Sequence, residues 1–195
     1  MNIRGLITSE HNKIETIDKF ANLKGGSGKI LVVTETHLIK GEHMKQEVVK
    51  YLPGYSLART DRDTSFDEES LDKCGGTLIS ASSDIINKEV EEFRYSNGNC
   101  ELSTVEMVQM EIAVLALYRP SGKNFSLAKF KDVMDKARAY LTELRANKPQ
   151  YKVIFCGDFN FPEEIVKWVN TEDGLIADPI AGNDRRKLAY KPEWL

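Results

Sequence analysis

The stretch Val153-Ile154-Phe155-Cys156-Gly157-Asp158-Phe159-Asn160 joins an apolar run of strand length to a carboxylate and a carboxamide. Such a run is typical of a strand buried on both faces, and open α/β folds place their chemistry at strand ends. In extended geometry Asp158 and Asn160 point to the same side, because they are two residues apart. Gly157 permits a close approach to the backbone or a sharp bend. The alternative is an ordinary strand that ends in an Asp/Asn turn.

Three further segments bring polar residues to the beginning or the end of a predicted strand. The β-branched run from Ile30 to Thr34 leads directly into Glu35. The run Leu115-Ala116-Leu117 leads into Tyr118-Arg119-Pro120, and the chain opens with Asn2-Ile3-Arg4-Gly5. Each block is short, so the information lies in their common order along the chain.

In this order, and with Arg59-Thr60-Asp61-Arg62 and Gly75-Gly76 in between, the chain resembles the endonuclease/exonuclease/phosphatase superfamily. This superfamily contains the apurinic/apyrimidinic endonucleases and DNase I. Within it, the blocks are most similar to the endonuclease domain of non-LTR retrotransposons. The resemblance implies the α/β class and a DNase I-like two-sheet sandwich with outer helices. It also implies that residues 1–195 form part of one such domain, incomplete at both ends.

The resemblance implies phosphodiester hydrolysis by a DNA endonuclease with Mg²⁺, or Mn²⁺ in its place. Glu35 is then the principal metal ligand, and Asp158 lies at the metal and orients or deprotonates the attacking water. Hard divalent cations prefer such oxygen ligands, and amides can serve both phosphate and metal. The remaining catalytic candidates are Asn2, Tyr118 and Asn160, and a buried tyrosine of the core is the alternative for Tyr118. The candidates for nucleic-acid contact are Arg59, Arg62 and Arg119. For Arg62 and Arg119 the alternative is a purely structural role.

The sequence also departs from the family. Relatives close their site with a Ser-Asp-His segment near the C-terminus, which does not occur before Leu195. The three histidines, His11, His37 and His43, all lie in the first quarter of the chain. We therefore expect this chain to be a weak or inactive nuclease. Two other functions stay open, namely a non-catalytic remnant that binds nucleic acid weakly and a phosphatase that acts on a small phosphoester.

Composition is that of an ordinary globular domain. The 195 residues carry a net charge of −3, so no overall basic field indicates a nucleic-acid partner. The three cysteines form no C-x-x-C motif, which favours an intracellular, reducing compartment. We expect a monomer that acts on DNA without a membrane partner. In an intact retroelement a reverse transcriptase would be its partner and the nucleus its location.

Hydrophobic periodicity predicts alternating helices and strands. The clearest helix spans 127–144, with Ser126 as its N-cap. In residues 105–118 the family shows two strands and a hairpin, but no Gly, Pro, Asn or Asp marks the turn. The segment from Lys24 to Lys29 is glycine-rich but is followed by a strand, so it does not indicate a nucleotide-binding loop. The other expected elements are helices at 14–23 and 44–52, a strand at 77–81, a loop at 59–74 and a charged excursion at 84–98.

Overall fold

The computed structural model describes residue 13, residues 29–38, 54–63, 75–120 and 126–160, and the backbone of two strands at 166–171 and 174–179. The chain divides into two compact units, Met1–Phe159 and Asn160–Leu195. The interpretation of 1–195 as one partial domain stays a prediction. The helices expected at 14–23 and 44–52 lie outside the described residues.

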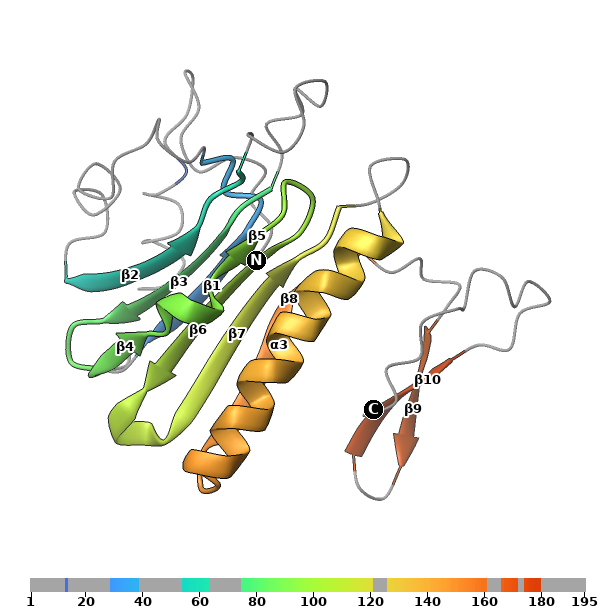
Figure 1. Ribbon diagram of the computed structural model, residues 1–195. Helices are drawn as coiled ribbons and strands as arrows, with labels where there is room; N and C mark the ends of the chain where they lie inside the picture. Colours follow the sequence, from blue (N-terminus) through green and yellow to red (C-terminus); the bar gives the residue numbers. More distant parts are fainter. Residues whose placement is uncertain are drawn as a thin grey trace. The chain divides into compact units, whose positions relative to one another are not determined.

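A three-stranded antiparallel sheet forms one layer of the first unit (Figure 1). It contains β1 (Ile30–Thr34), β3 (Thr77–Ser82) and β2 (Tyr55–Thr60), in the order β1-β3-β2. The strands predicted at 30–34 and 77–81 are thus confirmed. The loop predicted at 59–74 is wrong at its start, because Arg59 and Thr60 pair with β3 and continue the strand.

A mixed sheet forms the second layer, in the order β4-β6-β7-β8, with β5 also paired to β6. Its pairings are antiparallel except for β7 with β8, which is parallel. The region 84–98, predicted only as a charged excursion, contains two of its short strands and the 3-10 turn η2 (Glu91–Phe93). The strands are β4 (Asn87–Glu89), β5 (Tyr95–Ser96), β6 (Glu101–Met107), β7 (Ile112–Tyr118) and β8 (Lys152–Asp158).

The hairpin that sequence patterns did not locate connects β6 and β7. The short 3-10 turn η3 (Val108–Met110) ends at Glu111, whose φ of 52° is in the left-handed region. Glycine or asparagine normally occupies this conformation. A glutamate in its place leaves no turn signal in the sequence, which is why the hairpin was not predicted.

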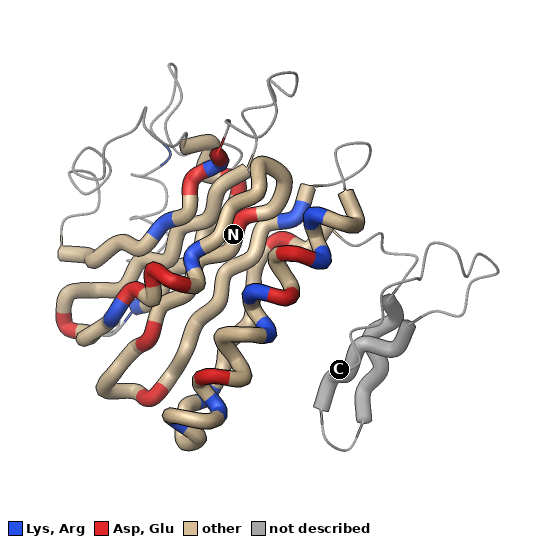
Figure 2. The backbone as a smooth tube through the Cα atoms, in the orientation of Figure 1, with Lys and Arg blue, Asp and Glu red and all other residues tan. Residues whose placement is uncertain are grey.

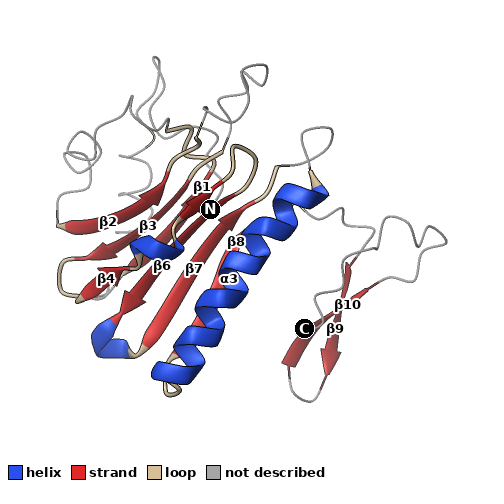
Figure 3. Ribbon diagram, viewed as in Figure 1, coloured by secondary structure: helices blue, strands red, loops and turns tan. Residues whose placement is uncertain are grey.

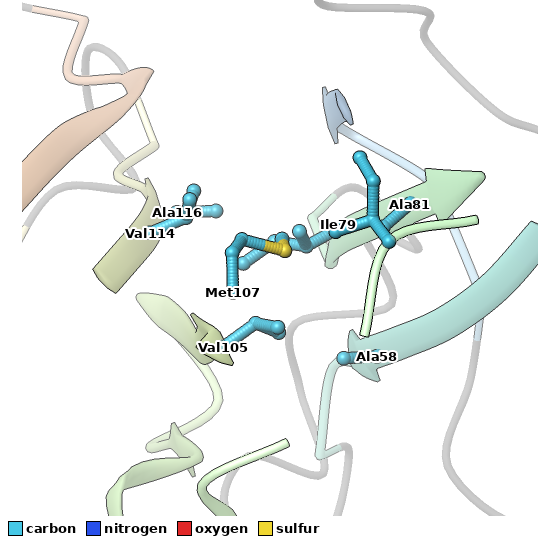
Figure 4. Close-up of a cluster of buried hydrophobic side chains, with 8 residues drawn as sticks. Ala58, Ile79, Ala81, Val105, Met107, Val114 and Ala116 are labelled. Atoms are coloured by element: carbon cyan, nitrogen blue, oxygen red, sulfur yellow. The ribbon is translucent and has the colours of Figure 1, made fainter. Parts of the chain in front are cut away.

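The core lies between the two sheets. Alternate residues of β6 and β7, among them Val105, Met107 and Val114, face Ile79 and Ala81 of β3 (Figure 4). Because consecutive side chains of a strand point to opposite faces, every second residue of each strand faces this interior. The first unit is therefore a two-sheet sandwich, as predicted from the resemblance.

Helix α3 (Leu127–Asn147) covers the outer face of the mixed sheet, as Figure 3 shows. The Ser126 side chain accepts a hydrogen bond from the Lys129 N–H, so the predicted N-cap is confirmed. The helix is held to β6 by Tyr140, whose hydroxyl donates to Glu106 at 3.3 Å. Glu106 alternates with Val105 and Met107, so its side chain leaves the sheet on the side of the helix. Among the described residues, no helix is long and apolar enough to cross a membrane.

Strand β8 contains the stretch that indicated the fold, but it is not buried on both faces as predicted. Ile154 is 44% exposed and Phe155 and Cys156 are only partly buried. In the described residues β8 is paired on one side only, to β7, which leaves its other edge without a neighbouring strand. The close approach predicted at Gly157 is confirmed, because a Cβ there would lie 1.9 Å from the carbonyl oxygen of Leu117.

The second unit contains an antiparallel pair of strands, β9 (Val166–Thr171) and β10 (Gly174–Pro179). The pairing begins between Thr171 and Gly174. Their spacing along the chain makes them a hairpin with a short connection.

Replacement of Gly157 by alanine tests the contact between β7 and β8. Gly157 has a φ of 145° and no room for a Cβ, so we expect Gly157→Ala to lower the free energy of unfolding by about 3 kcal/mol or more. The matched control is Gly54→Ala, where φ is 81° but nothing lies within 4 Å of the new Cβ. The control should cost about 1 kcal/mol, from backbone strain alone. Equal losses in denaturant titrations of the two variants would contradict this packing.

Candidate active site

Glu35 follows β1 directly and lies against Tyr118 from the other sheet. Its backbone is left-handed, with a φ of 55°. The hydroxyl of Tyr118 donates a hydrogen bond to Oε1 of Glu35 at 3.3 Å. The contact joins residues 83 positions apart in sequence and connects the ends of β1 and β7. Two of the candidate residues are thus brought together by the packing of one sheet on the other.

Asp158 is the neighbour of Tyr118 across the parallel pairing of β7 and β8. Cys156 packs against the inner core, and Asp158 is two residues further along the same strand. Tyr118 stands in the same relation to Ala116, which belongs to that core. Both side chains therefore leave their strands on the inner face. The strand ends that carry Glu35, Tyr118 and Asp158 consequently lie at one end of the sandwich, where β1, β7 and β8 all end.

Three linked hydroxyl groups from both sheets are buried in the interior of the sandwich. Ser103 of β6 lies 2.7 Å from the Thr77 hydroxyl and donates to the Thr60 hydroxyl at 2.9 Å. Thr60 in turn donates to the Leu102 carbonyl at 2.8 Å. All three hydroxyl residues are buried. Because each hydroxyl finds a partner, this end of the interior can be polar without the cost of unsatisfied groups.

The three arginines proposed for nucleic-acid contact do not form an exposed basic rim. Arg59 pairs with Asp61 at 3.0 Å, and the two side chains are 11% and 9% exposed. Arg119 is 8% exposed, and its Nη1 donates to the Phe159 carbonyl at 2.9 Å. Arg62 is also buried. Guanidinium groups readily form buried ion pairs and carbonyl contacts, and the burial of Arg62 and Arg119 agrees with the structural role that is the alternative for these two residues.

Arg62 pairs with Glu101, a residue that sequence analysis did not single out. Its Nε lies 3.3 Å from Glu101 Oε1, and its Nη2 donates to the Asn99 carbonyl at 3.2 Å. Glu101 begins β6 and is fully buried. Burial raises the pKa of its carboxyl group to about 7, against the opposing effects of Arg62 and of a backbone N–H. One signal in the sequence could have identified Glu101. It is a charged residue in the alternating series with Ser103, Val105 and Met107, whose side chains face the interior.

His37 belongs to the same loop as Glu35 and also has a left-handed φ, of 54°. Its Nε2 atom is buried and has no hydrogen-bond partner among the residues that the structure describes. Burial lowers the pKa of the imidazole, and the positive charges of Lys13 and Arg62 act in the same direction, against Glu35. The ring is therefore neutral near pH 7. His37 was set aside in sequence because of its early position, yet the fold places it beside the candidate metal ligand.

The remaining two candidates are the asparagines Asn2 and Asn160. Asn2 lies outside the described residues. Strand β8 ends at Asp158, and Asn160 has a φ of 44°, so the extended geometry that put the two side chains on one side does not hold. Asn160 also begins the second unit. Within the described ranges, no three His, Cys, Asp or Glu side chains are grouped so that they could hold a metal ion.

Comparison with solved structures identifies the architecture. A truncated form of TDP2 from Caenorhabditis elegans has a TM-score of 0.52 at 19% identity, over 86% of this chain and 66% of that one. The fold is DNase I-like. A further structure of C. elegans TDP2 gives a TM-score of 0.50 at 17% identity, over 86% of this chain and 51% of that one. The chain thus spans between half and two thirds of the length of these structures.

The 3′ phosphatase NExo from Neisseria, bound to a product DNA hairpin, is also similar. It has a TM-score of 0.47 at 16% identity, over 84% of this chain and 58% of that one. The endonuclease/exonuclease/phosphatase from Bacteroides vulgatus is also similar, with a TM-score of 0.43 at 12% identity, over 86% of this chain and 71% of that one. No family model and no curated protein sequence matches the chain. At these identities the likeness establishes the fold, and function has to be argued from the site itself.

The raised pKa of Glu101 predicts how the stability of the folded protein depends on pH. Because its pKa rises from 4.5 to about 7 on folding, the folded protein binds this proton more tightly than the unfolded chain. The group therefore stabilises the fold below pH 4.5 and loses that contribution as the pH rises to about 7. Glu101→Gln should remove this part of the pH dependence, as measured by urea unfolding at a series of pH values. Parallel curves for the two proteins over this range would contradict the assignment.

Proposed function

We propose that this domain hydrolyses phosphodiester bonds in DNA with a divalent cation, as an endonuclease of the retroelement type. The observation that carries the proposal is the meeting of Glu35, Tyr118 and Asp158 at one end of the sandwich. These residues come from three strand ends that are far apart in sequence. The family resemblance assigns the metal to Glu35 and Asp158, the attacking water to Asp158, and a contact with the phosphate to Tyr118.

The chemistry of the donors fits Mg²⁺. Glu35 and Asp158 offer carboxylate oxygens, and Mg²⁺ is commonly bound through one or two carboxylates while it keeps several waters. When bound, the cation would neutralise charge on a phosphate oxygen.

The protein's own groups have distinct tasks in this proposal. Asp158 orients the attacking water and accepts its proton, because a carboxylate at a strand end is available as a general base. Tyr118 donates its phenolic hydrogen, which the structure shows directed to Glu35, to an oxygen of the phosphate. Arg62 and Arg119 act as supports inside the fold and do not track the DNA backbone.

The charge distribution indicates that binding to DNA is weak. The chain has a net charge of −3, and Figure 2 shows acidic and basic residues interspersed along α3 and the strands. Phosphate contacts supply most of the affinity of proteins for DNA. We therefore propose that recognition depends on the phosphate at the site and not on an extended basic surface.

Cleavage of supercoiled plasmid DNA tests the proposed reaction. As expected for a weak nuclease, nicking should be slow. It should need Mg²⁺ or Mn²⁺, stop with EDTA, and fall by about 100-fold or more in Asp158→Asn. Glu111→Gln is the matched control, because Glu111 is exposed and lies in the hairpin before β7, at the other end of that strand from Tyr118. Undiminished nicking by Asp158→Asn would overturn the assignment. Hydrolysis of p-nitrophenyl phosphate without any nicking of DNA would favour the phosphatase alternative.

Metal binding can be tested without turnover. We expect calorimetric titration with Mg²⁺ or Mn²⁺ to show a weak site that disappears in Glu35→Gln, because the amide oxygen carries no net charge. Glu111→Gln again serves as the control. Identical titration curves for the wild type and Glu35→Gln would show that Glu35 is not the metal ligand.

A further inference from the structure

The loop that carries Glu35 has an unusual backbone. Both Glu35 and His37 have positive φ values, 55° and 54°, although neither is a glycine. Left-handed conformations of such residues persist only when the surrounding structure imposes them. Something outside residues 35–37 must therefore hold the loop in the shape that directs Glu35 to Tyr118.

The loop is held by the glycine pair that precedes β3. The Thr36 N–H donates to the Gly76 carbonyl at 3.4 Å, and the His37 N–H donates to the Gly75 carbonyl at 2.9 Å. A Cβ on Gly76 would lie 2.2 Å from the Thr36 hydroxyl oxygen. Only glycine lets the two segments approach this closely. The shape of the Glu35 loop thus depends on the position of Gly75 and Gly76.

The glycine pair is itself held by Glu101. Its Oε2 accepts a hydrogen bond from the Gly76 N–H at 3.1 Å. A Cβ on Gly75 would lie 2.9 Å from the same oxygen, so the carboxylate fills the space that the glycine leaves. Its other oxygen, Oε1, pairs with Arg62. Arg62 also donates its backbone N–H to the Leu38 carbonyl at 3.3 Å, which holds the far end of the same loop.

Glu101 is also the cross-strand partner of Tyr118 in the pairing of β6 and β7. Residues that stand opposite each other on antiparallel strands have side chains on the same face, within contact distance. The carboxylate therefore lies between the two elements that meet at the site. On one side is the strand position of Tyr118, and on the other is the glycine pair that holds the Glu35 loop.

We propose that Glu101 is a positioning residue for the candidate active site: through Gly76 and Arg62 it holds the Glu35 loop in register with Tyr118. The effect on catalysis rests on the proposed function, but the effect on the loop does not. Glu101 touches neither substrate nor metal in this scheme. It acts by fixing the backbone from which Glu35 reaches Tyr118.

Two substitutions of Glu101 test the charge of its side chain separately from its length. Glu101→Asp keeps the charge that pairs with Arg62 but is one methylene shorter, so it cannot hold both Gly76 and Arg62. Glu101→Gln keeps an acceptor of the right length for Gly76 but places an amide beside the guanidinium. The matched control is Glu106→Gln, on the same strand. Glu106 is 4% exposed and is bound to Tyr140 and Lys148, but it faces helix α3 instead of the site.

The direct readout is hydrogen exchange at the Thr36 and His37 amides. We expect Glu101→Asp to speed their exchange by about tenfold or more relative to the amides of β6 and β7, since local opening then no longer requires global unfolding. Glu106→Gln should change exchange near α3 and leave these two amides as they are. Unchanged protection in Glu101→Asp, or equal loss in both variants, would overturn the proposal.

The activity readout is plasmid nicking by the same proteins. We expect Glu101→Asp to lower kcat by about 100-fold with KM little changed, because misplaced groups lose rate more than binding. Glu106→Gln should retain the wild-type kcat. If the wild type does not nick DNA, the proposed function fails while the exchange experiment still decides the role of Glu101. A normal kcat in Glu101→Asp with faster amide exchange would limit the role of Glu101 to the loop and refute its part in catalysis.

Discussion

Strand β7 connects the core to the candidate site, because it is hydrogen-bonded to β6 on one side and to β8 on the other. At its end Tyr118 stands opposite Glu101 and beside Asp158. A slip of one residue in either pairing would turn a whole set of side chains to the other face of the sheet. The close contact of Gly157 with the Leu117 carbonyl and the inward apolar residues of the strands exclude such a slip.

At the end of the sandwich that contains the site, polar side chains occupy the interior as well as the surface. Linked hydroxyl groups lie next to the apolar core, and the pair of Glu101 and Arg62 lies near them. Buried ion pairs rarely add much stability, but removal of one partner is costly. This arrangement is therefore better explained by the geometry it imposes on the Glu35 loop than by the stability it adds.

The fold and the candidate site are different kinds of evidence about the function of this protein. The DNase I-like architecture follows from structural likeness at less than 20% identity, which says nothing about substrate. The proposal of a nuclease rests on the chemistry of Glu35, Tyr118 and Asp158 and on their convergence. Folds of this kind carry different activities on similar scaffolds, so only side chains at the strand ends can distinguish a nuclease from a phosphatase.

The local pattern of the sequence by itself determined the strands at 30–34 and 77–81, the helix after Ser126 and the tight contact at Gly157, because periodicity, capping and glycine act over a few residues. Tertiary structure alone decided the position of the turn at Glu111 and the burial of Arg62 and Arg119. It also decided the partners of Glu101, which come from segments 25 and 39 positions away. Propensity carries no information about contacts at such separation, since they exist only once the two sheets have packed.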